Sequence, residues 1–220
     1  MAQAVELTRR SLLAATIATA GVTGAGAQAL RPAGRLVFTV WRNKTNIGRH
    51  SLSFSGGDKD FIVAIDAVMA VGLGPIALFK YHHQATETWR GGQFAELQSH
   101  TTSNGKLDSV SAIRGPNGVI IKTQAGVHTM PPAAMPLTHW SPRALEGPLF
   151  NPQTGAPLHE SVSRQPGQTA WMANGRPVPA TRYTLAGDAD IADWYDAGGV
   201  WVALRGKAPD GSFLDYKRVV

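Results

Sequence analysis

The sequence predicts an all-β protein: a single antiparallel sheet of about ten strands that is strongly curved or closed into part of a barrel. Segments rich in β-branched and aromatic residues recur about every 10–12 residues, with turn sequences between them. The chain has 24 glycines and 14 prolines, and only 16% of its residues are charged. This composition suits a sheet with many turns. No apolar pattern with the helical period of about 3.6 residues persists after residue 30.

The expected strands follow one another from residue 36. In the first half of the chain we expect them at 36–41, 47–54, 61–71, 76–90, 94–102, 107–114 and 119–123. In the last third we expect them at 169–173, 178–185, 191–196, 200–205 and 212–219. Sequences such as Asn104-Gly105 and Asn174-Gly175 favour tight hairpin turns between neighbouring strands.

A proline-rich segment, residues 130–157, interrupts this pattern and is a poor candidate for strands. Within it, residues 142–147 predict a short helix, with Ser141 at the N-cap, Pro142 at the first position and Gly147 at the end. We interpret the segment as a crossing loop. A domain boundary is the alternative, but too few strands flank it on each side to fold separately, so residues 30–220 are expected to form one domain.

The N-terminal residues have the layout of an export signal. Arg9-Arg10 precedes a weakly apolar run, residues 12–20, and small residues lead to Ala27-Gln28-Ala29. The arginine pair indicates the bacterial twin-arginine class. We expect residues 1–29 to be a signal peptide cleaved after Ala29 or Ala27 and the protein to be periplasmic; an uncleaved tether is the alternative.

Composition excludes several functions. The net charge is +6, but the basic residues are dispersed, so we expect no nucleic-acid partner. The absence of cysteine excludes disulfides, thiolate zinc sites and thiol catalysis. The Gly-x-Ser-x-Gly and phosphate-loop motifs are absent as well. We expect no cofactor, no metal site and no assigned catalytic residue.

Six tryptophans are many for this length, and with other aromatic residues they either line an apolar cavity or fill a packed core. On the cavity interpretation, the predicted ligand-binding residues are Trp41, Phe79, Tyr81, His82, Trp89, Arg182, Trp194 and Trp201. Polar groups at the mouth, with Arg42, His82 and Arg182 as candidates, would orient the ligand's head.

Titratable residues offer an enzymatic alternative. If two or more candidates converge in a pocket, a catalytic role is favoured, and if they disperse, binding is favoured. The candidates are His82, His100, His128, Asp66 and Glu87. An acidic segment, residues 188–196, does not match the calcium-binding EF-hand pattern, so Asp193 and Asp196 are expected to solvate and cap a hairpin.

Several short motifs occur in an order that resembles the DUF6134 family of exported bacterial proteins. They are Trp41-x6-Ile47-Gly48-Arg49-His50, Glu87-x-Trp89, Thr101-x2-Asn104-Gly105, Trp194-Tyr195-Asp196-x2-Gly199 and Asp210-Gly211-Ser212. The Ile-Gly hairpin start and the closing Tyr-Asp-x2-Gly hairpin are more weakly similar to the DUF3108 family. The resemblance implies an exported, curved antiparallel sheet that wraps an apolar groove, and it implies no catalytic residues.

The first functional hypothesis is a periplasmic binding or carrier protein for an apolar or amphipathic small molecule, without chemistry. An envelope structural or assembly protein is the alternative, expected if the interior is filled and an edge strand is exposed. A hydrolase or isomerase acting on an envelope lipid or sugar is the third hypothesis. Transient contact with the envelope is a further expectation.

Overall fold

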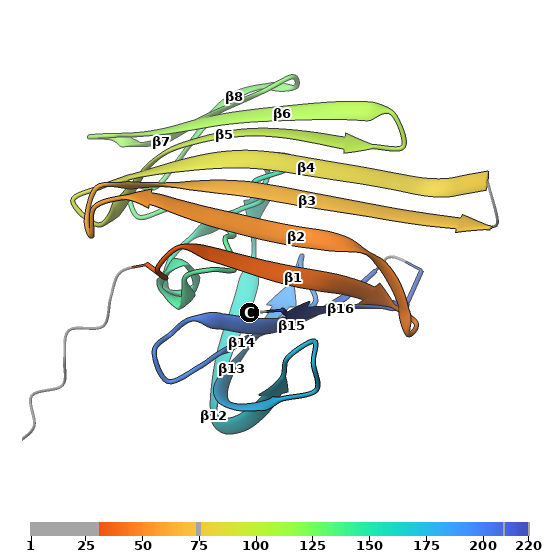
Figure 1. The fold of residues 1–220 in the computed structure, drawn as a ribbon. Helices are drawn as coiled ribbons and strands as arrows, with labels where there is room; N and C mark the ends of the chain where they lie inside the picture. Colours follow the sequence, from red (N-terminus) through yellow and green to blue (C-terminus); the bar gives the residue numbers. More distant parts are fainter. Residues whose placement is uncertain (1–30, 74–75, 209, 220) are drawn as a thin grey trace, which may run out of the picture.

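The computed structural model describes residues 31–73, 76–208 and 210–219, so the expected signal peptide, residues 1–29, lies outside the described residues. These parts contain sixteen strands (Figure 1): β1 Arg35–Arg42, β2 Thr45–Gly56, β3 Phe61–Leu73, β4 Ile76–Arg90, β5 Gln93–Ser103, β6 Lys106–Gly115, β7 Gly118–Thr123, β8 Gly126–Met130, β9 Met135–Pro136, β10 Leu149–Phe150, β11 Pro157–Leu158, β12 Glu160–Trp171, β13 Pro177–Gly187, β14 Ile191–Tyr195, β15 Trp201–Lys207 and β16 Phe213–Arg218. The described residues include no helix that is long and apolar enough to cross a membrane.

Thirteen of these strands form one antiparallel sheet. Its order is β12-β13-β14-β15-β16-β1-β2-β3-β4-β5-β6-β7-β8, so every pairing joins strands that are consecutive in sequence except the pairing of β16 with β1. The sheet is not closed, because β8 and β12 are its two edges. The all-β prediction is confirmed, whereas the expected number of about ten strands was too low.

Side-chain alternation places the core on one face of the sheet. In β1, Leu36, Phe38 and Val40 are buried, while Val37 and Thr39 between them are partly exposed. Asn104 (φ 48°) and Gly105 (φ 84°) join β5 to β6 in left-handed conformations, which a tight hairpin turn requires. Alternation with a period of two residues therefore determines which side chains of each strand face the core, and the turn residues determine how neighbouring strands pair.

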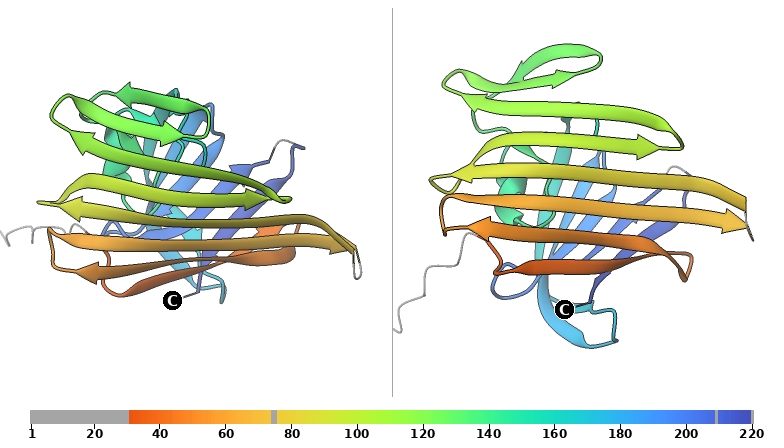
Figure 2. Two further views of the ribbon diagram at one scale, coloured as in Figure 1. Left: turned by 90° about the horizontal axis from the view of Figure 1, so that it is seen from above. Right: turned by 45° about the horizontal axis from the view of Figure 1, so that its top comes forward.

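The two halves of the sheet face each other across one core. Figure 2 shows the blue strands of the C-terminal half behind β1–β6 and crossing them at a steep angle. Side chains from both halves meet there: the ring centres of Phe38 and Trp201 are 4.0 Å apart. Leu97 and Ile121 from one half and Leu185 and Leu204 from the other belong to the same buried cluster.

The proline-rich segment was only partly predicted. Its helix is confirmed as a 3-10 helix, η1 (Pro142–Glu146), although the Ser141 side chain makes no capping hydrogen bond. Contrary to the crossing-loop interpretation, this region also forms the three short strands β9, β10 and β11, which make a second sheet. Trp140 and Phe150 pack into the main core, so apolar burial stabilises this segment where strand propensity is poor.

Strand β12 begins nine residues earlier than the expected strand at residue 169. It contains Pro166 and Gly167, and its pairing with β13 shifts register between Gln165 and Gln168. β12 is an edge strand, where a proline loses no ladder hydrogen bond, and the bulge absorbs the irregular residues. Pro166 and Gly167 therefore disturb the pairing of β12 locally but do not end the strand.

The Ile-Gly motif has a steric cause. A Cβ atom at Gly48 would lie 2.0 Å from the carbonyl oxygen of Val68 on β3, so only glycine allows the two backbones to approach this closely. Ile47, beside it, packs into a small apolar cluster with Val40 and Met69. The motif therefore positions Ile47 where β2 meets β3.

Candidate functional site

A groove with two chambers lies on the core-facing side of β2–β4 and β16. The outer chamber has a volume of about 500 Å³ and the inner chamber about 180 Å³. They share four lining residues, Met69, Tyr81, Gln153 and Tyr216, so the chambers adjoin each other. The site thus consists of two adjoining chambers and not of a single closed cavity.

The outer chamber is apolar in its walls and charged at its rim. Ile47, Met69 and Leu214 belong to one apolar cluster that forms its wall. Arg42 forms an ion pair with Asp210, and its Nε–H donates to Ser212 Oγ at 2.8 Å. A ligand with an apolar body and a polar end matches this arrangement.

Two buried histidines line the inner chamber. His50 is only 8% exposed, and its ring packs edge-on against Trp201 and Tyr216. Among the residues that the structure describes, neither of its ring nitrogens has a hydrogen-bond partner. Burial, helped by the neighbouring histidines, lowers the pKa of His50 to about 3. Burial likewise lowers the pKa of His83 to about 4, so both rings are neutral at pH 7.

Glu87 is a fully buried carboxyl on the wall of the inner chamber. Its Oε2 accepts hydrogen bonds from the indole N–H groups of Trp89 and Trp140, both at 3.0 Å. Burial raises the pKa of Glu87, while these two donors and the nearby Thr138 hydroxyl oppose that shift. The paired tryptophans hold the carboxyl group in one orientation.

His139 lines the same chamber and is held by a buried carboxylate. Its Nδ1 lies 3.0 Å from Asp193 Oδ2, and Asp193 is fully buried. The other carboxylate oxygen accepts the Nε1–H of Trp201 at 2.9 Å, and the Trp201 ring stacks on His139. In the neutral imidazole, Nδ1 carries the proton that is donated to Asp193, which leaves Nε2 as the acceptor.

Three of the sequence-predicted residues meet at this groove. Phe79 and Tyr81 line the outer chamber, with ring centres 6.4 Å apart, and Tyr81 continues into the inner chamber. Arg42, a predicted mouth residue, lies at the rim. Burial raises the pKa of Tyr81, and a hydrogen bond with Gln153 opposes that shift.

Two predicted residues fill the core and do not line either chamber. Trp89 stacks on Phe61, and Trp201 is fully buried against Phe38. Their indole N–H groups instead hold the carboxylates of Glu87 and Asp193. For these two tryptophans, the packed-core alternative describes the structure.

The other four predicted residues lie on the outer face of the sheet. Trp41 donates to Thr39 Oγ1 on the face opposite Phe38, and His82 pairs with Asp66 at 2.8 Å. Arg182 lies over the ring of Trp194, 5.2 Å from its centre. The structure therefore places His82 and Arg182 away from the mouth, because each follows the opposite alternation from the core-facing residues of its strand.

Three of the five candidate catalytic residues lie together, but outside the groove. Asp66 and His100 line a depression on the outer face, and His82 Nε2 lies 2.8 Å from Asp66 Oδ1. Of the five, Glu87 alone is among the described residues that line the groove. The sequence analysis did not select the histidines that do converge, His50, His83 and His139. For His83 a signal existed: it shares strand parity with Trp89, whose large apolar ring marks the inward face. In the described part of the chain, no three His, Asp or Glu side chains are arranged to hold a metal ion.

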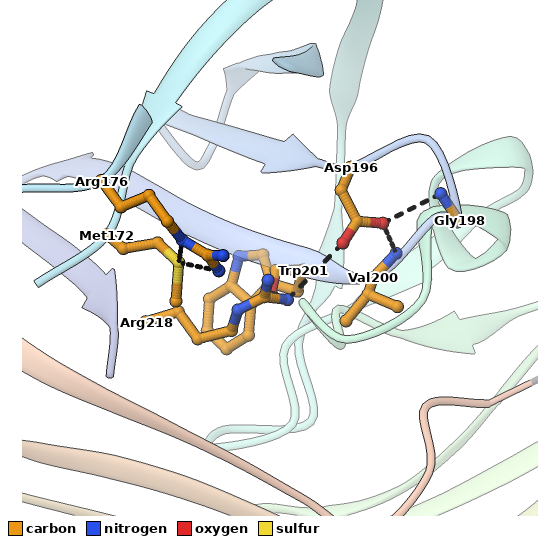
Figure 3. Close-up of polar contacts among 7 residues, drawn as sticks. All are labelled: Met172, Arg176, Asp196, Gly198, Val200, Trp201 and Arg218. Carbon is orange, nitrogen blue, oxygen red and sulfur yellow. Dashed lines mark hydrogen bonds and ion pairs between the residues drawn. The ribbon is translucent and has the colours of Figure 1, made fainter. Parts of the chain in front are cut away.

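A second polar cluster fixes the hairpin between β14 and β15, away from the groove (Figure 3). Asp196 Oδ1 accepts the backbone N–H groups of Gly198 and Val200, both at 3.0 Å. Its Oδ2 lies 3.7 Å from Arg218 Nη1, which also donates to the Trp201 carbonyl. The expected capping role matches these contacts of Asp196, and the Tyr-Asp-x2-Gly motif is structural. For Asp193 the same expectation was wrong, because this carboxylate is fully buried and bonds His139 and Trp201 instead of solvent.

Replacing Asp196 with alanine is expected to lower the free energy of unfolding by about 1–3 kcal/mol, because two turn N–H groups and a buried guanidinium lose their acceptor. Urea denaturation measures this loss. Asp196→Asn is the matched control, since it keeps an acceptor for the turn and removes only the charge that faces Arg218. Equal stability of wild type and Asp196→Ala would contradict the assignment.

Comparison with solved structures shows the same class of fold. The chain is similar to a β-barrel-like protein of a domain of unknown function, DUF1849, from Brucella abortus, with a TM-score of 0.59 and 12% sequence identity. The match covers 84% of this chain and 94% of that one, and at this identity it shows the fold alone. A search of curated proteins finds no match.

The chain belongs to the DUF6134 family, described as a domain of unknown function, whose model matches residues 38–219. The resemblance drawn from the ordered motifs is therefore confirmed. The weaker similarity to the DUF3108 family stays a prediction.

Proposed function

We propose that this protein is an exported, periplasmic binding or carrier protein that takes up an apolar or amphipathic small molecule in the two-chamber groove. The observation that carries the proposal is the outer chamber, whose volume of about 500 Å³ lies within the usual size range of ligand pockets. Its apolar wall would cover the ligand's body, and burial of that body supplies the affinity.

The charged rim would orient the bound ligand. Arg42 is tied to Asp210 and Ser212, so it is held at the mouth instead of moving freely in solvent. Lys207, on β15, also lines this chamber. A polar or anionic group left at the mouth would meet these cations, while the apolar body lies inside.

Native mass spectrometry of protein purified from the periplasm tests the proposal. An added mass that organic extraction removes would identify a carried molecule and its class. A protein that carries no added mass, and that takes up none of a panel of fatty acids, alcohols, amines and sterols at micromolar concentration, would contradict it. Fractionation of cells, with and without Arg9-Arg10 changed to lysines, tests the export step.

Replacing Phe79 with alanine is expected to weaken ligand binding by about 1–3 kcal/mol, through loss of buried apolar contact. Trp194→Ala, on the outer face, is the control and should bind normally. Titration calorimetry with the ligand found by mass spectrometry measures both. If the Trp194 variant loses affinity and the Phe79 variant does not, the ligand lies elsewhere.

A second candidate function is catalysis by the inner chamber. It is favoured by the Asp193–His139 pair, in which a buried carboxylate orients an imidazole so that Nε2 is available as a base. A hydrolase or isomerase acting on an envelope lipid or sugar would use that nitrogen. Turnover that is abolished in His139→Asn, in protein that still binds the ligand, would establish this candidate over a carrier.

A role in envelope assembly is the third candidate. Strand β12 is an exposed edge of the main sheet and could pair with another chain. Its Pro166 and its bulge work against such pairing, since both interrupt an edge. The assembly role therefore ranks below binding.

A further inference from the structure

The two chambers of the groove differ in charge and in hydrogen-bonding chemistry. Both cations that line the groove, Arg42 and Lys207, belong to the outer chamber. In the described part of the chain, none of the residues that line the inner chamber is a lysine or an arginine. The inner chamber instead has the carboxyl groups of Glu87 and Asp188 on its wall.

The acceptors of the inner chamber are held in place by buried partners. Two indole N–H groups fix Glu87, and Asp193 fixes the His139 ring so that Nε2 is its acceptor nitrogen. Trp201 holds Asp193 in turn and stacks on His139. Such support by neighbouring groups is typical of binding sites, because it removes the cost of ordering them when a ligand enters.

Neutral histidines complete the chamber. His83 places Nδ1 2.8 Å from Thr101 Oγ1, and His50 closes one side with a ring whose nitrogens have no partner among the described residues. Neutral imidazoles, hydroxyls and amides can donate as well as accept, but no described lining residue is a lysine or arginine that would offset the carboxyl groups of Glu87 and Asp188. The chamber therefore suits a head that donates hydrogen bonds better than an anionic head, which would meet these carboxyl groups without a counter-charge.

We infer that the inner chamber binds a hydrogen-bond-donating head, an ammonium or a hydroxyl group, of the ligand whose apolar body fills the outer chamber. The inference rests on the proposed binding function and names the chemistry of the ligand. The head contacts Glu87 and His139 Nε2. The far end of the ligand then lies at the rim, beside Arg42.

Binding of decylamine, decanol and decanoate to the full mature protein tests the inference by titration calorimetry. Decylamine or decanol is expected to bind at least about tenfold more tightly than decanoate, as a charge-assisted hydrogen bond implies. Non-specific electrostatic attraction cannot place decylamine ahead of decanoate, because the mature chain without Arg9, Arg10 and Glu6 has 19 basic and 14 acidic residues, and this net charge of +5 would favour the anion. The ratio of decylamine to decanol distinguishes an ammonium site from a hydroxyl site.

Two variants test whether the preference for decylamine or decanol over decanoate arises in the inner chamber. Glu87→Gln keeps an acceptor for the two tryptophans but turns a donor towards the ligand, and it should reduce the preference over decanoate to less than about threefold. His139→Asn keeps a donor to Asp193 and removes Nε2, and it should also reduce the preference over decanoate. Glu96→Gln, on the outer face, is the matched control and should keep the full preference.

The outcomes separate the inference from the proposed function. Equal or tighter binding of decanoate, or a preference that survives in both Glu87→Gln and His139→Asn, overturns the inference and leaves the binding function standing. If no decyl compound binds, the proposed function fails for this ligand class. In that case, butylamine and butyrate are added separately at high concentration, and the NMR signals of the His83 and His139 ring protons are followed. Shifts with butylamine but not with butyrate support the inference, and the absence of shifts with butylamine overturns it.

Discussion

Lowering the pH from 7 to 5 is expected to remove about 4 kcal/mol of the stability contributed by His50 and His83, because both are buried in neutral form. Their pKa values in the folded protein are about 3 and about 4, against 6.5 in the unfolded chain. Each histidine contributes about 2 kcal/mol to the loss over this range, since one pKa unit corresponds to about 1.36 kcal/mol.

The sign follows from proton uptake. Below pH 6.5 the unfolded chain binds protons at both histidines, whereas the folded protein does not bind them until the pH approaches 4. Stability is therefore fully present above pH 6.5 and is lost as the pH falls through that value. Glu87 acts in the opposite direction, because its raised pKa lets the folded protein take up a proton first.

A comparison of wild type with His50→Phe isolates the contribution of His50 to the pH dependence, because Glu87 is present in both proteins and its effect cancels. Phenylalanine fits the aromatic surroundings of Phe38, Trp201 and Tyr216. The variant should be at least as stable as wild type at pH 7 and should lose about 2 kcal/mol less between pH 7 and 5. His100→Phe, on the outer face, should retain most of the wild-type loss. Urea denaturation at both pH values measures this, and an unchanged loss in His50→Phe would contradict the assignment.

Replacing Trp201 with alanine is expected to destabilise the protein by about 3–5 kcal/mol, among the largest effects of any single change. The ring is fully buried and packs on Phe38 and His139. Its Nε1–H also serves Asp193, a carboxylate with no solvent exposure, so the substitution leaves a buried charge with one donor fewer. Urea denaturation at pH 7 measures the loss.

Two further variants separate packing from hydrogen bonding. Trp201→Phe keeps most of the ring and removes only the donor, for which a loss of about 1–3 kcal/mol is expected. Trp41→Ala, on the outer face, should cost much less than Trp201→Ala. If Trp201→Ala keeps its stability and loses only ligand affinity, then the cavity-lining role predicted from the sequence is correct and the core assignment fails.

The strands from β1 to β7 were predictable because each has a recognisable sequence pattern and pairs with a strand that is adjacent to it in the sequence. Alternation in β1 and the Asn104-Gly105 turn depend only on neighbouring residues, and hairpins pair strands that are adjacent in sequence. β12 was only partly predicted, because the tolerance of Pro166 depends on the strand lying at the edge of the sheet. That position is a property of the whole sheet.

The site was less predictable than the fold. Phe79, Tyr81 and Arg42 line one chamber, and their role in binding stays a prediction. Trp41 and Trp194 were selected on the same ground, their aromatic side chains, and they lie on the other face of the sheet. His139 was not selected, because it comes from the proline-rich segment and meets Asp193 across more than fifty residues. No spacing rule connects such a pair.

The sequence by itself determined the all-β class, the hairpin order and the family, because alternation, turn residues and ordered motifs are local. It also excluded thiol and disulfide chemistry, since composition alone decides that. Only the tertiary structure decided which tryptophans fill the core, which face is inward and which buried partners meet Glu87 and His139. These depend on how the two halves of the sheet face each other, and burial across that interface acts between residues far apart in the chain.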